Sequence, residues 1–462
     1  MIALLLTLAL QPVDRLVIVV GHNASPDRPA LRFADDDAAR TFELLAPGAA
    51  WATLLTTLDA PSQEVFAHLV AVAHPPTQGE VAAAFAEAGR RAEAARAAGR
   101  RAEVTFVYAG HGDVQDGEGR VHLADGPLTR SALKAHVGAL PAAHRVHLII
   151  DACRSWFLVA GRGPGGQRAP VPAPFAGPAW GERVGLLVST SGDADSHEWA
   201  AIQGGIFSHE VRSALAGGAD VDGDGAVRYD EVAAFVANAN LGVEAVTYRP
   251  EVYIRPPAAE LNAALFAPAA PRVRLDLPRE PARWSISEKG LRYADLHKGE
   301  GPLAIWLLPQ RRYEVRQGAQ SWTVQSDTSP IALAGLPADP PEVAAATRGE
   351  AHRAFEQLFQ NPFDPGVLRG FRLGRDLVAE APPPVEAEAS VLPRVLLAGG
   401  IATTAGGVVL GLLAADARLE AADAPQARRA ELNDRGTALG YGAAAALAVG
   451  VGALAVALWE VW

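Results

Sequence analysis

The stretch from Leu16 to Leu215 alternates apolar, strand-like runs with stretches of helical character. The runs are apolar without interruption, which is typical of strands that are buried on both faces of a parallel sheet. Strands that alternate with helices build a parallel sheet covered by those helices. We predict strands at residues 16–23, 51–58, 104–112, 120–123, 145–153 and 185–191, and helices at 35–45, 81–98, 129–137 and 205–215. This part of the chain is therefore expected to be an α/β domain with a mainly parallel sheet.

The length of 462 residues exceeds what one hydrophobic core organises, so two or more units are expected. After the α/β domain the sequence changes to short, alternating β-like pieces typical of a small sandwich or barrel. A helical patch and a linker rich in Pro and Glu follow. The expected order is a signal segment at 1–13, the α/β domain at 14–262, a small β domain at 268–340, a helical segment at 341–380, a linker at 381–394, a transmembrane helix at 395–414, a polar loop at 415–437 and a second transmembrane helix at 438–459.

The two C-terminal segments are predicted to span a membrane because each is an uncharged, apolar run of about 20 residues. The first ten residues suit a signal-peptide core but lack a preceding Lys or Arg, and the alternative is a segment that packs on the fold. Arginines flank the first span on both sides, so charge alone leaves the orientation open. Together the signal segment and the spans predict a membrane-anchored protein whose α/β domain is extracytoplasmic, in the periplasm.

The net charge, the cysteine content and the absence of certain motifs argue against several classes of protein. The net charge of −11, with no clustered basic face, argues against nucleic acid as a partner. The chain contains one cysteine, so it forms no intrachain disulfide, and this residue is either inert filler or a reactive group. Phosphate-binding loops, zinc-ligand spacings and Gly-rich dinucleotide motifs are absent from the sequence, so no organic cofactor is expected.

The cysteine, Cys153, and His111 stand at the ends of two predicted strands, where His111 follows the apolar part at 104–109 and Cys153 follows the apolar part at 145–150. Reactive groups of parallel sheets lie where strands end at their carboxyl edge. A cysteine that attacks an amide needs a neighbouring imidazole and donors for the oxyanion. The backbone N–H groups of Gly112 and Cys153 are the expected donors. We therefore predict that His111 and Cys153 form a catalytic pair.

These motifs resemble the caspase-like cysteine peptidases, and more closely the bacterial and metacaspase branch than the animal caspases. The resemblance covers residues 14–262. Its markers are YAGHG around His111, DACR around Cys153, and then STS and GGIFSHEV. The family separates its His and Cys by a similar distance. The resemblance implies a peptidase that cleaves proteins or peptides through an acyl-enzyme.

Asp151 marks a departure from animal caspases, which carry Gln two positions before the nucleophile. The metacaspase-like pattern has an Asp there and a second acid in the first strand-to-helix connection, which falls on Asp37. The resemblance implies that both line the substrate pocket and favour Arg or Lys before the scissile bond. Paired carboxylates are well neutralised by a guanidinium. The alternative is that both are strand-end or capping acids without a ligand.

A twelve-residue stretch, DVDGDGAVRYDE at 220–231, matches the calcium loop of an EF-hand. The expected ligands are the side chains of Asp220, Asp222, Asp224 and Glu231 and the carbonyl oxygen of Ala226. Predicted helices flank the loop on both sides, and the sequence contains no second copy of it. We therefore predict a structural or tuning Ca²⁺ site, with an unoccupied polar loop as the alternative.

The function that these observations favour is a membrane-anchored cysteine endopeptidase that cuts proteins after Arg or Lys. One alternative is a catalytically silent caspase-like scaffold that binds protein partners at the membrane. A second is a calcium-responsive regulator in which residues 220–231, rather than the thiol, carry the function.

Overall fold

A computed structural model describes residues 13–152, 180–190, 198–200, 202–244, 249–268, 271–340 and 350–379, and isolated residues between 413 and 443. The chain divides into two compact units, Met1–Leu368 and Arg369–Trp462. Cys153, most of the candidate signal segment and the 381–394 linker lie outside the described residues.

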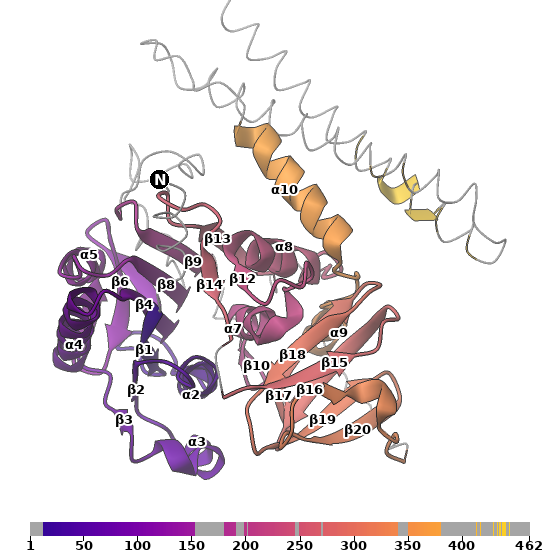
Figure 1. Cartoon of the computed structure of the whole chain (residues 1–462). Coiled ribbons are helices and arrows are strands. Elements are labelled where there is room, and N and C mark those ends of the chain that lie inside the picture. The colour runs from indigo at the N-terminus through magenta and orange to yellow at the C-terminus, as the bar shows by residue number, and fades with distance from the viewer. Residues whose placement is uncertain are drawn as a thin grey trace, which may run out of the picture. The chain divides into compact units, whose positions relative to one another are not determined.

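A central, mainly parallel sheet of seven strands organises the first unit (Figure 1). The strand order is β13-β9-β8-β4-β1-β2-β3, and all neighbours are parallel except the edge strand β13, which is antiparallel to β9. The strands are β1 (Val13–His22), β2 (Trp51–Thr56), β3 (Ala73–His74), β4 (Arg101–Gly110), β8 (Arg145–Ala152), β9 (Val184–Thr190) and β13 (Glu251–Arg255). Strands β1, β4 and β8 are buried on both faces, which explains their uninterrupted apolar sequences.

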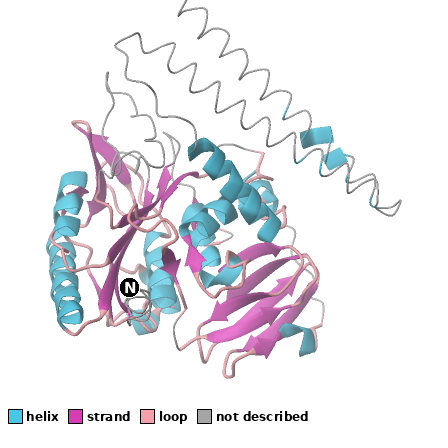
Figure 2. Cartoon of the chain, turned by 45° about the horizontal axis from the view of Figure 1, so that its top comes forward, coloured by secondary structure: helices cyan, strands magenta, loops and turns pink. Residues whose placement is uncertain are grey.

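Helices cover both faces of this sheet (Figures 1 and 2). Strand β1 packs closely against α2 at Gly21. A Cβ atom added to Gly21 would lie only 2.5 Å from the Cβ of Ala38 in α2. The opposite face of β1, which carries Ile18, shares one core with the buried side of α4. The helices of this part are α2 (Ala34–Leu45), α3 (Ala60–Val65), η1 (Ala67–Leu69), α4 (Gln78–Ala97), α5 (Arg130–Gly138), α7 (Ile206–Ser213), η3 (Ala214–Gly218) and α8 (Tyr229–Ala239).

Short antiparallel pieces surround the main sheet. The predicted strand at 120–123 belongs to one of these, a three-stranded sheet in the order β5-β6-β7, and not to the central sheet. The pieces are β5 (Gly112–Gln115), β6 (Glu118–Leu123), β7 (Gly126–Thr129), β10 (Glu198–Trp199), β11 (Gly204–Gly205), β12 (Val227–Arg228) and β14 (Ala264–Phe266).

A β domain with two further sheets follows in the same unit. One sheet has the order β18-β15-β21 and the other β17-β16-β19-β20. The strands are β15 (Val273–Leu277), β16 (Ala282–Glu288), β17 (Leu291–Lys298), β18 (Leu303–Leu307), β19 (Arg312–Gln317), β20 (Gln320–Gln325) and β21 (Ile331–Ala332), followed by η5 (Leu333–Gly335), α9 (Glu350–Gln357) and α10 (Pro365–Ala379). Trp284 from one sheet and Ile305 from the other are fully buried.

The β domain packs directly against α7 and η3. His209 Nε2 of α7 lies 2.8 Å from Asp295 Oδ2 of β17, and both side chains are buried. An added Cβ at Gly217 would lie 2.4 Å from the Ala304 carbonyl oxygen, so the backbones of η3 and β18 are in close contact. Helix α7 is therefore enclosed between the central sheet layer and the β domain.

The predicted transmembrane helices at 395–414 and 438–459 require a correction, because the described part of the chain contains no helix that is both long and apolar enough to cross a membrane. The longest described helix, α4, has 20 residues but is rich in Arg and Glu, and α10 has 15 residues and carries several Arg. Most of the residues at 395–414 and 438–459 lie outside the described residues. The predictions of a membrane partner and of a membrane-anchored, periplasmic location are corrected by the same finding.

Candidate active site

The first turn of α2 brings acidic side chains to the carboxyl edge of the sheet. It contains three acids in succession, Asp35, Asp36 and Asp37. Carboxylates are favoured there because the N-terminus of a helix carries a partial positive charge. Phe33 occupies the N-cap and makes no side-chain cap, but Asn23, just after β1, accepts the Ala34 N–H at 2.8 Å through Oδ1. The start of α2 is thus held at the end of β1.

A pocket of about 470 Å³, including its open mouth, lies at this edge. Its walls come from the ends of β4 and β8, from α2 and from β10 and β11. Three carboxylates line it, those of Asp37, Asp151 and Glu198. The two acids implied by the family resemblance are therefore brought together, although they are far apart in sequence.

Asp37 is buried and has two fixed partners. Its Oδ2 accepts the backbone N–H of Gly205 at 2.7 Å, and its Oδ1 lies 2.7 Å from Arg212 Nη1 of α7. The second contact is an ion pair and not a hydrogen bond, because neither Asp37 Oδ1 nor Arg212 Nη1 has a hydrogen-bond partner among the described residues. Arg212 therefore compensates the Asp37 charge by proximity.

Asp151, near the end of β8, is held by α7. Its Oδ2 accepts from the Ser208 hydroxyl at 2.6 Å and from the Ser208 N–H at 3.1 Å. Burial, together with the negative charge of Asp37, raises the pKa of Asp151 to about 6, although the Ser208 bonds oppose this shift. The carboxylate would be stabilised by a cation that enters the pocket.

Glu198 is a third pocket acid that sequence reasoning missed. Its carboxylate accepts the backbone N–H groups of Arg32 and Phe33 at 2.9 and 2.8 Å, which joins β10 to the segment before α2. Burial and the charges of Asp37 and Asp151 raise the pKa of Glu198 to about 7. The only available sequence signal was its place between the STS and GGIFSHEV motifs.

The glycines of β11 let the backbone approach the carboxylates. A Cβ at Gly204 would lie 2.5 Å from Asp37 Oδ1, and a Cβ at Gly205 would lie 2.8 Å from Asp151 Oδ2. Contacts this short would force one group to move. The GG pair of GGIFSHEV is therefore needed for the shape of the pocket.

His111 follows β4 and is buried at one side of this edge. Its Nε2 lies 3.0 Å from the Pro29 carbonyl oxygen. A carbonyl only accepts, so Nε2 carries the proton and Nδ1 has the lone pair. Nδ1 is buried without a hydrogen-bond partner among the described residues. Burial lowers the pKa of His111, and the bond to Pro29 opposes this, so the neutral ring is favoured at pH 7.

The backbone around His111 depends on Gly110, which adopts φ +154° and lies against the Tyr108 hydroxyl. Gly112 begins β5, with Val121 of β6 as its register partner. Gly110 is paired in register with Ala152, the last residue of β8. Cys153 comes next in the chain and lies outside the described residues.

The EF-hand-like loop runs between η3 and α8. Carboxylate oxygens of Asp220, Asp222 and Asp224 lie within 4.8 Å of one another. Gly225, the sixth residue, has φ +81°, as the sharp turn of such a loop requires. Asp220 Oδ1 and Glu231 Oε1 are buried and have no hydrogen-bond partner among the described residues.

Arg228, the ninth residue of the loop, competes for the same carboxylates. Its Nη2 is bonded to Asp224, and its Nη1 lies 3.9 Å from Asp222 and 4.0 Å from Glu231. The Arg228 N–H also donates to Glu231 Oε2 at 2.7 Å. A cation that uses these oxygens would have to displace the guanidinium. The carbonyl of Ala226 belongs to the same loop, between Gly225 and Val227.

Comparison with solved structures found distant likenesses over about half of the chain. A protein from Geobacter sulfurreducens is 17% identical, with a TM-score of 0.34, and the match covers 55% of this chain and 98% of that protein. Caspase-1 from Spodoptera frugiperda is 12% identical, with a TM-score of 0.32, covering 54% of this chain and 87% of the caspase. Its pro-form is also 12% identical, with a TM-score of 0.31, covering 54% and 92%. Protein-family models and curated proteins gave no match to this chain.

Proposed function

We propose that this chain is a cysteine endopeptidase that cleaves protein or peptide substrates after Arg or Lys. The observation that carries the proposal is the pocket with three carboxylates, which opens where β4 and β8 end side by side. His111 follows the first of these strands and Cys153 the second. A nucleophile, a base and a cation-binding pocket would then meet at one edge of the sheet.

In the proposed reaction the Cys153 thiolate attacks the scissile carbonyl carbon and forms the C–S bond of a tetrahedral intermediate. The N–H groups of Gly112 and Cys153 are the proposed donors to its oxyanion. The C–N bond then breaks, and the leaving amine takes a proton from His111, which had received it from the thiol. Water hydrolyses the thioester and regenerates the thiol. The Nδ1 of His111, which has no hydrogen-bond partner within the described part of the chain, supports its role in these proton transfers.

The preference for a basic residue is supported by the charges in the pocket. Arg212 already compensates Asp37, whereas Asp151 and Glu198 have raised pKa values. A substrate guanidinium or ammonium between these acids would relieve their repulsion and favour their charged forms. An acidic substrate residue would meet like charge at the same place.

The first test compares the rates at which the full chain cleaves fluorogenic peptides that differ only in ending with Arg or Asp. We expect cleavage of the Arg peptide, none of the Asp peptide, and loss of activity in Cys153→Ala. Asp151→Asn should raise KM for the Arg peptide by about tenfold or more, the effect of losing one charged hydrogen bond. If Cys153-dependent cleavage is absent with both peptides, the scaffold alternative takes its place.

We further propose that residues 220–231 bind Ca²⁺ through Asp220, Asp222, Asp224, Glu231 and the Ala226 carbonyl. The clustered Asp oxygens support this proposal, as do the two buried carboxylate oxygens that lack a hydrogen-bond partner in the described ranges. Hard cations with six to eight oxygen ligands suit such a set. The contacts of Arg228 imply that Ca²⁺ binds against an internal competitor.

Calorimetric titration of the full chain with Ca²⁺ tests this site. Glu231→Gln should weaken binding about tenfold or more, because it removes a charged ligand. Arg228→Gln should instead tighten binding, because the competing cation is gone. A gain in affinity cannot arise from misfolding, so equal affinity in the native chain and both variants would exclude the site.

A further inference from the structure

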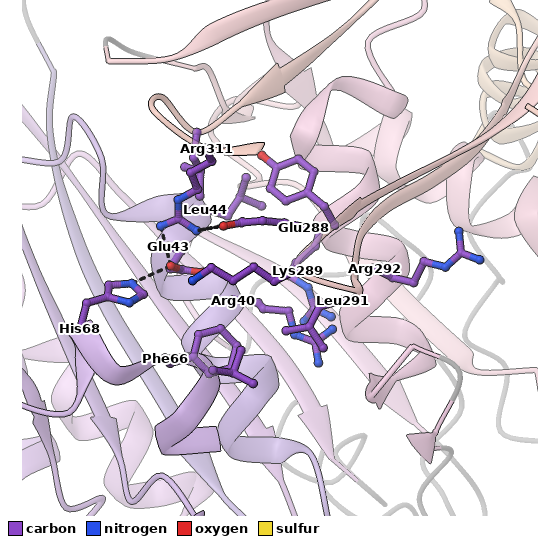
Figure 3. A pocket seen from close by; sticks show the side chains of 14 residues that line it. Arg40, Glu43, Leu44, Phe66, His68, Glu288, Lys289, Leu291, Arg292 and Arg311 are labelled. Carbon is purple, nitrogen blue, oxygen red and sulfur yellow. Dashed lines mark hydrogen bonds and ion pairs between the residues drawn. The ribbon is translucent and has the colours of Figure 1, made fainter. Parts of the chain in front are cut away.

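A second pocket lies between α2 and α3 of the α/β layer and the β16–β17 hairpin of the β domain (Figure 3). It has a volume of about 550 Å³, including its opening. Much of its wall is apolar, and Leu44, Phe66, Leu291 and Leu308 contribute to it. No step of the proposed peptidase reaction uses this pocket.

Cationic side chains outnumber carboxylates around this pocket. Five Arg or Lys side chains line it, against two carboxylates, Glu43 and Glu288. Arg311 is already bonded to both acids, at 2.6 Å to Glu43 and 2.9 Å to Glu288, and His68 Nε2 lies 2.8 Å from Glu43 (Figure 3). The acids of the wall are therefore engaged with Arg311 and His68. Two other cations have carboxylate partners outside the lining, since Arg292 lies 3.3 Å from Asp295 and Arg212 lies 2.7 Å from Asp37.

Two of these cations, Arg40 of α2 and Arg212 of α7, are buried, with 8% and 3% of their surfaces exposed. Arg40 donates to the carbonyl oxygens of Ile202 and Gln203, but its Nε has no acceptor among the described residues. Arg212 Nε, Nη1 and Nη2 also have no hydrogen-bond acceptor there. Buried donors without acceptors destabilise the fold, and more so when they are charged.

Arg40 is buried and also lies near the positive charge of Arg212. Burial and the charge of Arg212 lower the pKa of Arg40 to about 10. The geometry thus provides buried N–H donors without acceptors among the described residues, beside apolar walls. These are complementary to a molecule with one anionic head and an apolar body.

We propose that this pocket binds a small carboxylate with an apolar body and that the bound carboxylate regulates the substrate pocket through Arg212. The regulatory part rests on the proposed function. Arg212 lines the second pocket and also lies 2.7 Å from Asp37, which lines the substrate pocket. One guanidinium therefore serves both pockets.

The direction of the coupling follows from charge. A carboxylate on Arg212 competes with Asp37 for the guanidinium, so the substrate pocket becomes more negative. A cationic substrate group should then bind more tightly. Because coupling between two sites is reciprocal, a cation in the substrate pocket should tighten binding of the carboxylate by the same factor.

The binding part is tested by calorimetry with octanoate and with 1-octanol, a neutral molecule of the same chain length. We expect octanoate to bind the full chain at least about tenfold more tightly than octanol, since a charged hydrogen bond distinguishes them. Leu291→Asp should reduce octanoate affinity by a similar factor, because it adds like charge to the apolar wall. Leu241→Asp, at a position that is 64% exposed and remote from the lining, is the matched control.

Equal binding of octanoate and octanol would overturn recognition of the carboxylate, and absence of octanoate binding would overturn the proposal as a whole. Leu291→Met, which keeps an apolar wall, should bind octanoate like the native chain. If Leu291→Asp binds octanoate as tightly as the native chain does, the assignment to this pocket is wrong.

The regulatory part is tested in the Cys153→Ala chain with benzamidine, a planar cation that probes the substrate pocket without catalysis. Saturating octanoate should tighten benzamidine binding about fivefold, within the usual range of such couplings. Unchanged benzamidine affinity would overturn the coupling and leave the proposed function intact. Conversely, a native chain that cleaves no peptide would count against the peptidase proposal. Octanoate binding to the second pocket would not be affected by that result.

Discussion

Asp151 and Glu198 have raised pKa values for the same two reasons, burial and neighbouring negative charge. An acid with a raised pKa is partly protonated at neutral pH, so the charge of the substrate pocket changes between about pH 6 and pH 7. A cationic ligand requires the ionised forms. Its affinity should therefore increase with pH across this interval and level off above it.

Glu198→Gln separates the two titrations. In the Cys153→Ala background, benzamidine affinity should rise with pH in two steps when Glu198 is present, near the two pKa values. With Gln at this position we expect only the lower step, due to Asp151, and about tenfold weaker binding above pH 7.

Calorimetry at a series of pH values measures the affinity for benzamidine in both chains. Because no catalysis takes place, the effect of His111 on the reaction does not enter the measurement. Glu182→Gln, an exposed acid outside the pocket lining, serves as the control and should behave like the parent. A pH profile that is unchanged in Glu198→Gln would show that this residue does not contribute to the pocket charge.

At the scale of elements, α7 connects most of the features described above. Ser208 holds Asp151, Arg212 compensates Asp37, and His209 contacts Asp295 of the β domain. The helix then passes through η3 to the loop at 220–231. Movement of α7 would therefore alter both pocket acids together, which makes it the element through which either proposed ligand would act.

Elements formed by long apolar runs were predictable from the sequence. Strands β1, β4 and β8 are buried on both faces, so hydrophobicity alone locates them, and parallel pairing then places their ends at one edge. Asp37 could be assigned only through the family resemblance. Glu198 could not be found, because its role depends on two N–H groups at Arg32 and Phe33, which are distant in sequence.

The pairing of Arg212 with Asp37 was likewise invisible in the sequence, because neither periodicity nor a motif links α7 to α2. The transmembrane prediction failed for a different reason. A run of apolar residues establishes hydropathy, whereas a membrane span also requires one helix of sufficient length, and the described residues contain none.

At the scale of the whole molecule, the buried contact between His209 and Asp295 joins the α/β layer to the β domain. Burial opposes the charge of Asp295, but Arg292 and the bond from His209 outweigh it and lower its pKa. A carboxylate with a depressed pKa stabilises the fold above its unfolded pKa, and this contribution is lost as the pH falls through the folded value.

Asp295→Asn should therefore lower the free energy of unfolding by about 2 kcal/mol at pH 7, as expected for losing a buried hydrogen bond to a charged group. The difference from the native chain should shrink in acid, where Asp295 is protonated in both states. Urea denaturation of both chains measures this difference in the free energy of unfolding. Asp276→Asn, which removes an exposed pair with Arg274, should change stability by less than about 0.5 kcal/mol.

The close approach of Gly204 and Gly205 to the pocket acids has an evolutionary consequence. A single methyl group at either position would collide with Asp37 or Asp151, while the central sheet and its core would remain untouched. One codon change at either position would therefore displace a pocket acid and should weaken the proposed recognition of a basic residue. The residues at these two positions in related chains would record whether this pocket is kept.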